Sequence, residues 1–301
     1  MRVLKNGVKK LRGSQPFNFI ATSLVHGLSS ALNTRSEAVI KHLHRVGTVR
    51  SKLPNGATLV LWSSGDDWIS NQVYWRGWDG YEEETTPLFF RMARSARVTI
   101  DVGAFVGYYS LLAAHANVSC QVYAFEPLEQ IYQRLKTNVR LNSLSNVECI
   151  SGAVGDTDGE AQFFHQGTNM PSSSSLSYEF MRSSVGASEV ISSSVSLITI
   201  DRFVRERAID RVDLVKIDTE STEPQVLRGM ALTLRKDRPA IFCEVLQGRG
   251  TEHDLEEILG PLGYRYYLLT DRGPVERERI QGDPRWLNYL FIDRDIAELP
   301  S

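Results

Sequence analysis

The chain has 301 residues, 42% of them hydrophobic and 23% charged, which is the composition of a globular protein with one large domain or one domain and an appendage. The formal net charge of −2 gives no overall basic field to hold a polyanion, so nucleic acid is not the expected substrate. No apolar run is long enough to span a bilayer. The three cysteines are odd in number and unclustered, which indicates free thiols in a reducing compartment and predicts a cytoplasmic protein.

Residues 1–80 are expected to form an N-terminal appendage, first helical and then a β-hairpin, ahead of a domain at 81–301. The chain begins with a basic segment and turns moderately apolar from 17 to 32, as a signal peptide or an amphipathic helix does. Asn18 and His26 interrupt the apolar run and no good cleavage site stands out, which favours the amphipathic helix.

Helical structure is expected over residues 1–45, with the basic side chains of Lys41, His42, His44 and Arg45 on one face. The two histidines could bind a metal, but without an accompanying carboxylate or cysteine cluster solvated helix positions are favoured. Two strands, 48–53 and 57–62, flank a Pro-Asn-Gly turn and predict the hairpin. A helix is expected over 81–94, with three consecutive glutamates in a first turn that the helix dipole favours.

A strand, a tight glycine turn and a helix follow from residue 98. Residues 98–101 are apolar and β-branched up to an acid, Gly103 and Gly107 come next, and an apolar helical pattern begins directly afterwards. The second strand, 121–125, is also apolar and is followed by Glu126. This order is typical of a βαβ unit.

The acids of this unit indicate a nucleoside-containing cofactor. Glu126 at the tip of the second strand is placed to accept hydrogen bonds from a ribose diol. A dinucleotide fingerprint needs further glycines where Phe105 and Tyr108 stand, which disfavours a pyrophosphate. Asp101 would repel a phosphate and suits a cationic group, such as the ammonium or sulfonium of S-adenosylmethionine. The alternative is an ordinary strand–turn–helix whose glycines only permit the turn.

The alternation of strands and helices then continues, interrupted by a serine-rich stretch typical of a flexible loop or a lid. The ranges expected as strands are 146–150, 161–165, 190–198, 212–218, 239–244, 264–269 and 287–292, and those expected as helices are 128–141, 224–235 and 255–259.

Four of the strands end in acids: Asp101, Glu126, Asp218 and Glu244. In an open α/β sheet the ligand crevice lies at the carboxyl ends of the strands. Clustered carboxylates repel one another unless cations, hydrogen-bond donors or protons accompany them, so four acids at one edge indicate a binding site. The loop after the third strand is expected to contact the base through the backbone of residues 153–154.

Three segments together resemble the FkbM-type S-adenosylmethionine-dependent methyltransferases: Ile100–Ser110, Ala124–Pro127 and Leu214–Glu223 with its following Leu-Arg-Gly. The resemblance extends over about residues 80–270 by motif order. It implies a Rossmann-like class I methyltransferase fold of the α/β class, a mostly parallel twisted sheet with helices on both faces. It also implies methyl transfer to a hydroxyl oxygen of a sugar, in a glycan or glycolipid, or of a polyketide natural product.

Carried over residue by residue, the resemblance places the glycine turn at Asp101, Gly103 and Gly107, the ribose acid at Glu126 and the later acidic motif at Asp218 and Glu220. One departure is Ser221, which replaces the glycine of the family's Asp-x-Glu-Gly pattern and puts the local turn geometry in doubt. The full set expected to bind S-adenosylmethionine is Asp101, Gly103, Ala104, Gly107, Glu126, Pro127, Ala153, Val154 and Asp218.

Catalysis is expected to need a base near the acceptor oxygen, since a sugar hydroxyl is a poor nucleophile. Asp218 or Glu220 is expected to fill that role, with Glu244 as a second acid; His165 and His253 are weaker candidates. No metal is expected, a divalent ion between Asp218 and Glu244 being the minor alternative. Methylation of nitrogen or nucleic acid and a non-catalytic scaffold are the competing functions, and homo-oligomer formation stays open.

Overall fold

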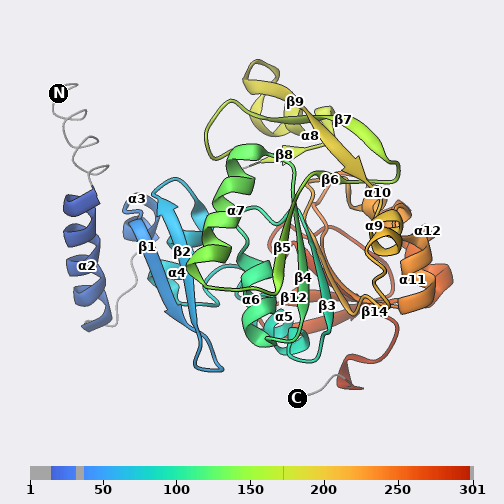
Figure 1. Ribbon diagram of the computed structural model, residues 1–301, viewed down its shortest axis with the longest axis horizontal. Helices are drawn as coiled ribbons and strands as arrows, with labels where there is room; N and C mark the ends of the chain where they lie inside the picture. Colours follow the sequence, from blue (N-terminus) through green and yellow to red (C-terminus); the bar gives the residue numbers. More distant parts are fainter. Residues whose placement is uncertain (1–14, 32–36, 172, 299–301) are drawn as a thin grey trace. The chain divides into compact units, whose positions relative to one another are not determined.

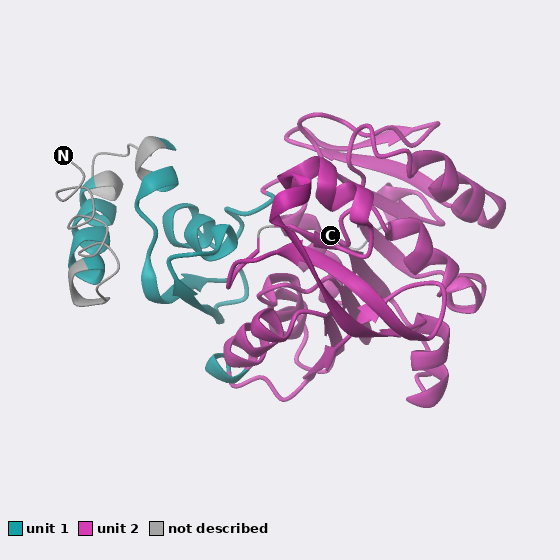
Figure 2. Cartoon of the chain, turned by 90° about the horizontal axis from the view of Figure 1, so that it is seen from above, with its two compact units in different colours: residues 1–82, 140–142 teal, residues 83–139, 143–301 magenta. Residues whose placement is uncertain are grey.

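The computed structural model describes residues 15–31, 37–171 and 173–298. The chain divides into two compact units (Figure 2). Unit 1 comprises residues 1–82 with 140–142, and unit 2 comprises residues 83–139 with 143–301. Within the described residues, no helix combines the length and the apolar character that crossing a membrane requires.

Unit 1 contains the predicted hairpin. Its strands β1 (Val46–Lys52) and β2 (Thr58–Ser64) pair antiparallel, from Val46 opposite Ser64 to Lys52 opposite Thr58. Helices α2 (Gln15–Ala31), α3 (Glu37–His42) and α4 (Trp68–Arg76) complete the unit. The expected helix over 1–45 is thus two helices that end before the hairpin, and residues 1–14 and 32–36 lie outside the described residues.

Unit 2 is built on an eight-stranded sheet with the order β13-β12-β14-β11-β10-β3-β4-β5 (Figure 1). Neighbouring strands from β5 to β11 are parallel, and β14 joins antiparallel between β11 and β12. The chain order reverses between β3 and β10, which is the switch point where doubly wound folds bind ligands. The strands are β3 (Val98–Val102), β4 (Gln121–Glu126), β5 (Val147–Ser151), β10 (Leu214–Ile217), β11 (Ala240–Glu244), β12 (Arg265–Thr270), β13 (Gly273–Arg277) and β14 (Asn288–Ile292).

Helices cover both faces of this sheet (Figure 1). One face packs its apolar side chains with those of α9 (Ile200–Glu206), α10 (Glu223–Arg228), α11 (Ala231–Asp237) and α12 (Glu252–Leu259) in one continuous core. The other face carries α5 (Thr86–Ala93), α6 (Tyr108–Ala116) and α7 (Glu129–Leu141). The Phe89 ring of α5 contacts both Tyr109 of α6 and Phe242 of β11 edge to face. The predicted Rossmann-like α/β fold is confirmed.

Strand register decides which side chains enter the site. Successive residues of a strand point to opposite faces, so Ile100 and Val102 enter the core with α9–α12 while Asp101 points to the α5–α6 face. Lys216 of β10 is paired with Asp101 in the parallel ladder, which brings both charged side chains to that same face.

A second, four-stranded sheet with the order β6-β9-β7-β8 fills residues 153–198. Its strands are β6 (Ala153–Val154), β7 (Gly159–Gln166), β8 (Ser174–Ser175) and β9 (Val190–Ile198), and α8 (Tyr178–Val185) lies between β8 and β9. The serine-rich stretch therefore contains a strand and a helix. Short 3₁₀ turns stand at Ala187–Glu189, Gly260–Leu262 and Ile296–Glu298.

Two helix predictions are wrong. The helix expected over 81–94 begins only at Thr86, with Pro87 in its first turn, so the glutamates at 82–84 precede it. The helix expected over 224–235 is two helices, α10 and α11, that break at Gly229. A Cβ on Gly229 would lie 1.9 Å from the Gly155 carbonyl oxygen, so the break brings two backbones into close contact. The strand β13 was not predicted.

Candidate active site

The turn after β3 packs directly against the loop after β10. Gly103 has a left-handed φ of 78°, and a Cβ there would lie 1.9 Å from the Asp218 carbonyl oxygen. The backbone N–H groups of Gly103 and Ala104 donate to the Phe125 carbonyl at 3.1 and 2.9 Å. Only glycine meets both demands, positive φ and no side chain. The ends of β3, β4 and β10 are thereby fixed around one point.

The same turn begins α6. Gly107 is the N-cap with a φ of 88°, and its N–H donates to the Ala104 carbonyl at 2.8 Å. A Cβ on Gly107 would lie 2.5 Å from a methyl group of Leu135, so α7 packs closely on the turn. Both predicted turn glycines therefore adopt conformations that other residues rarely accept.

Glu126 is held in one orientation by two backbone donors. Its Oε2 accepts from the Phe105 N–H at 3.1 Å and its Oε1 from the Leu128 N–H at 2.9 Å. Pro127 between the strand and Leu128 fixes the backbone that presents the second donor. Each carboxylate oxygen keeps further acceptor capacity. Burial raises the pKa of Glu126 to about 7, although the two N–H donors oppose the shift.

Asp101 lies on β3, the strand next to Glu126 on β4, and accepts a hydrogen bond from a side chain of its own surroundings. The Ser110 hydroxyl donates to Asp101 Oδ2 at 2.5 Å. Burial raises the pKa of Asp101 to about 6, and the Ser110 hydrogen bond and the charge of Lys216 work in the opposite direction. A cation placed here would stabilise the ionised carboxylate.

Lys216 is a functional candidate that the sequence analysis missed. The side chain is 1% exposed, and its Nζ lies 3.4 Å from Asp218 Oδ2 and 3.1 Å from Asn288 Oδ1. The ammonium also lies 5.1 Å from the centre of the Tyr109 ring. The signal was available: a lysine inside an apolar strand must find partners, because an unpaired buried charge is costly.

The acidic loop after β10, residues 218–223, is held in its turn by hydrogen bonds to the carboxylate of Glu223. Glu223 Oε1 accepts from the Thr219 N–H at 3.2 Å, from the Thr219 hydroxyl at 3.0 Å and from the Ser221 N–H at 3.1 Å. Glu220 and Ser221 take left-handed φ values of 56° and 79°. Ser221 thus occupies a conformation suited to the glycine of the family pattern, and the turn forms nevertheless. Among the described residues its buried hydroxyl oxygen has no hydrogen-bond partner.

Two of the three acids predicted to be catalytic, Glu220 and Glu244, have raised pKa values. Burial, with the charges of Asp218 and Glu223, raises the pKa of Glu220 to about 8. Burial, with the charges of Asp218 and Glu220, raises the pKa of Glu244 well above its ordinary value. The buried Oε2 of Glu244 has no hydrogen-bond partner within the described residues. This atom is available to form a hydrogen bond with a ligand.

The second sheet contacts the acidic loop. The Ser175 hydroxyl of β8 donates to the Glu220 carbonyl at 2.7 Å. In the loop after β11, Arg249 donates to the hydroxyls of Ser183 and Ser184 at 2.6 and 3.2 Å, and its guanidinium lies 4.6 Å from the Phe180 ring centre. The loops after β10 and β11 are therefore both tied to residues 174–184.

The other predicted residues lie as follows. Ala153 and Val154 are buried in β6, and the preceding Gly152 N–H donates to the Glu126 carbonyl at 3.3 Å, which places this loop beside Glu126. His165 is buried in β7 with its Nε2 3.0 Å from the Ser193 hydroxyl. His253 is exposed on α12 and pairs with Glu257 at 3.2 Å. The structure brings neither histidine to the acids.

Within the described residues, no group of three or more His, Cys, Asp and Glu side chains is arranged to hold a metal ion. The acceptor groups of the site fit a cationic, hydroxyl-bearing ligand. Glu126 offers oriented acceptor oxygens, Asp101 offers a buried carboxylate, and the glycine turn leaves room for close approach of a ligand to the backbone. These features match S-adenosylmethionine better than a phosphate-bearing cofactor.

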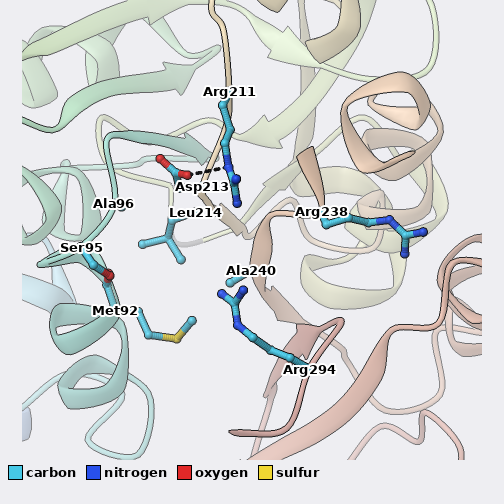
Figure 3. Close-up of a pocket in the computed structure, with 9 residues that line it drawn as sticks. All are labelled: Met92, Ser95, Ala96, Arg211, Asp213, Leu214, Arg238, Ala240 and Arg294. Carbon is cyan, nitrogen blue, oxygen red and sulfur yellow. Dashed lines mark hydrogen bonds and ion pairs between the residues drawn. The ribbon is translucent and has the colours of Figure 1, made fainter. Parts of the chain in front are cut away.

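A hollow of about 200 Å³ lies at the opposite, amino edge of the sheet (Figure 3). Arg211 and Arg294 point toward one another across it, over a floor that includes Leu214 and Ala240. Arg211 is paired with Asp213 at 2.9 Å. This hollow is separate from the acidic edge, because Asp213 precedes β10 whereas Asp218 follows it.

The sheet order, the helices on both faces and the glycine turn beside an acidic edge define a Rossmann-like methyltransferase of class I. Residues 101–266, more than half of the chain, match the family described as Methyltransferase FkbM domain. The chain belongs to this family of methyltransferases, which confirms the predicted resemblance.

Individual relatives are more distant. The chain is 26% identical over 188 residues to Methyltransferase sdnD of Sordaria araneosa, an alignment that covers 55% of this chain and 72% of that protein. It is 27% identical over 165 residues to the AMB antimetabolite synthetase AmbE of Pseudomonas aeruginosa, covering 44% of this chain but 8% of that protein. A crystal structure of Methyltransferase FkbM from Methylobacillus flagellatus is 14% identical with a TM-score of 0.43, covering 75% of this chain and 54% of the other.

Proposed function

We propose that this methyltransferase uses S-adenosylmethionine to methylate a hydroxyl oxygen of a sugar, glycan, glycolipid or natural product. The observation that carries the proposal is the buried acidic edge, where Asp101, Glu126 and Glu244 are 2%, 4% and 9% exposed beside a glycine turn that admits no side chain. Clustered buried carboxylates fit a cationic ligand with hydroxyl donors.

Each part of this edge has a role in holding the cofactor. Glu126 accepts hydrogen bonds from the ribose hydroxyls, since the backbone N–H groups of Phe105 and Leu128 orient its two oxygens. Asp101 faces the positive end of the cofactor, and Ala153 and Val154 lie beside the base. When bound, S-adenosylmethionine supplies a methyl carbon on a positively charged sulfur, which leaves as a neutral thioether.

Asp218 is the base among the acids of this edge. Burial raises the pKa of Glu220 to about 8 and the pKa of Glu244 well above its ordinary value, which favours the protonated form of both carboxyls. Asp218 is the carboxylate that pairs with Lys216 at 3.4 Å. It accepts the hydroxyl proton of the acceptor as the oxygen–carbon bond forms, while Glu244 orients the acceptor as a hydrogen-bond donor.

The nature of the acceptor is supported by two observations. The chain is similar to AmbE, an antimetabolite synthetase, which fits a natural-product acceptor. The hydrogen bond between Ser175 and the acidic loop supports residues 174–184 as a wall of the acceptor site, where hydroxyls and the 42% exposed Tyr178 ring offer polar and stacking contacts. Such a wall suits a polyhydroxylated or aromatic molecule.

Binding and turnover separate the roles of two acids. Calorimetric titration should show S-adenosylmethionine binding to the wild type, and Glu126→Gln should weaken it by about tenfold to a hundredfold, since hydrogen bonds to a charged group are lost. Glu148→Gln is the matched control, because Glu148 lies on the adjacent β5 and pairs with the exposed Arg207. Absence of binding by the wild type would instead indicate a scaffold protein.

Asp218→Asn should lower turnover by about 10²–10⁴-fold and leave cofactor affinity within a few-fold, as expected for a lost base. Asp213→Asn at the other end of β10 is the control, and its turnover should stay near that of the wild type. Turnover is followed by mass spectrometry of a glycan or metabolite pool, in which the product gains one methylene. Unchanged turnover of Asp218→Asn would remove this residue from the mechanism, and an N-methyl product would contradict O-methylation.

A further inference from the structure

Helix α2 of unit 1 is amphipathic, but its apolar side faces outward and its polar side faces the rest of unit 1. Three of its apolar side chains face outward, with 59% exposure for Ile20, 63% for Leu24 and 63% for Leu28. They stand four residues apart and so form one stripe along the helix. Phe19, 54% exposed, flanks the stripe. A surface helix of a globular protein ordinarily turns such a stripe to the core.

The face that packs on the rest of unit 1 is polar. Asn18 accepts from the Val46 N–H at 2.8 Å and donates to the His44 carbonyl at 2.9 Å. Thr22 accepts from the guanidinium of Arg45 at 2.7 Å, and Arg45 is only 6% exposed. Arg45 was expected on the basic face of a helix with Lys41. It instead lies just before β1 and is buried, which corrects that prediction.

These two faces are on opposite sides of the helix. Asn18, Thr22 and His26 also stand four residues apart, and each precedes a residue of the apolar stripe by two positions. Two positions correspond to a rotation of about 200° around the helix axis, so the two sets lie on opposite sides. His26 continues the inward face, with its ring centre 5.0 Å from Tyr74 and 5.6 Å from Trp75. Hydrogen bonds and ring contacts therefore fix the helix so that its apolar side remains outward.

The surrounding sequence has the charge that complements an anionic surface. The first 36 residues contain six cations and no acid, in a chain of net charge −2. The cations are Arg2, Lys5, Lys9, Lys10, Arg12 and Arg35. An exposed apolar stripe next to a basic segment is the composition of helices that lie in a membrane interface and prefer anionic lipids.

We propose that α2 docks unit 1 on an anionic lipid surface, with Ile20, Leu24 and Leu28 inserted between the headgroups. The positive charge of the neighbouring sequence complements the negative charge of such a surface. In this arrangement the helix lies in the plane of the interface. This docking is independent of the methyl-transfer chemistry, and its test needs no activity.

Flotation of the full chain with vesicles tests the proposal. The chain should float with phosphatidylcholine vesicles that contain phosphatidylglycerol, and much less with phosphatidylcholine alone or at high salt. Leu24→Glu and Leu28→Glu should each lower the vesicle partition coefficient by about tenfold or more, since each removes a leucine from an apolar environment. Lys9→Gln should lower it by about fivefold.

The control is Leu232→Glu, which changes an equally exposed leucine, 62% exposed, on α11 of unit 2. It should float like the wild type, and thermal unfolding of all variants checks that they fold. Failure of the wild type to float, or equal flotation of the stripe variants, would overturn the proposal. So would a self-association that Leu24→Glu abolishes in the absence of vesicle binding, because the stripe would then join two copies of the chain.

Discussion

The two edges of the large sheet carry opposite charges in different surroundings. At the carboxyl edge, Asp101 and Glu126 are 2% and 4% exposed, and burial raises both pKa values. At the amino edge, the Arg211 side chain is 49% exposed and Arg294 is also exposed. An exposed guanidinium keeps its charge and its hydration, whereas a buried carboxylate loses its hydration.

The two groups of charges differ in what stabilises them. The buried carboxylates need a bound ligand, whereas the exposed arginines are stabilised by water. Buried acids with raised pKa values destabilise the folded chain at neutral pH, and a bound cation offsets that cost. Solvated arginines around a hollow involve no such cost and need no ligand. The comparison therefore supports the proposal that the cofactor binds at the carboxyl edge.

The largest effect is expected where the carboxyl edge is most closely packed. Gly103→Ala should lower the free energy of unfolding by about 2–5 kcal/mol, because a methyl group 1.9 Å from the Asp218 carbonyl must displace the backbone. Cofactor affinity should fall with it, since Asp218 and the turn move apart. Urea unfolding and calorimetric titration measure the two changes.

Gly263→Ala is the control for this substitution. Gly263 has nearly the same φ, 73° against 78°, but nothing lies within 4 Å of its missing Cβ. Its free energy of unfolding should fall by only about 1–2 kcal/mol, the cost of placing alanine in the left-handed conformation, and its cofactor affinity should not change. Equal losses in both variants would show that the contact with Asp218 contributes nothing.

An intermediate effect is expected from pH. The pKa values of Asp101, Glu223, Glu126 and Glu220 are raised to about 6, 6, 7 and 8, so the folded chain binds more protons than the unfolded chain above pH 4. The contribution of these four groups to the stability of the free protein is therefore fully present below their unfolded pKa values and is lost as pH rises toward 8. Thermal unfolding across this range should show the decline.

Cofactor binding should release protons at neutral pH, because S-adenosylmethionine brings one net positive charge to these carboxyls. Calorimetry in buffers of different ionisation enthalpy measures the number released, and the neutral demethylated by-product should release fewer. Arg294→Gln at the amino edge should leave the number unchanged. Equal release with both ligands would contradict the placement of the cationic group beside the acids.

The smallest effect concerns the acidic loop. Ser221→Gly should stabilise the protein by about 0.5–1 kcal/mol, because relief at a φ of 79° exceeds the entropy that glycine adds to the unfolded chain. Ser143→Gly shares the positive φ, 54°, at an exposed position, so it lacks the gain from removing a buried hydroxyl. Chemical denaturation compares the two variants, and a larger gain for Ser143→Gly would exclude a cost of the Ser221 hydroxyl.

Much of the fold follows from local sequence pattern. The apolar run at Val98–Val102, the glycines at 103 and 107 and the acids after the strands predicted the βαβ unit and the parallel sheet, which the structure confirms. Such features act over a few residues: β-branched runs favour strands, and glycine permits positive φ. The family followed from the same motifs.

Contacts between residues far apart in the chain decided the rest. Lys216 reaches Asn288 across 72 residues of sequence, Gly229 breaks a helix against Gly155, and Asn18 turns the apolar side of α2 outward by bonding to residues 44 and 46. No local pattern specifies these contacts, because burial and hydrogen-bond satisfaction depend on which segments meet. The sequence by itself determined the order of the elements and the acids at the strand ends. The tertiary structure decided which acids are buried, with raised pKa values, and which surfaces stay exposed.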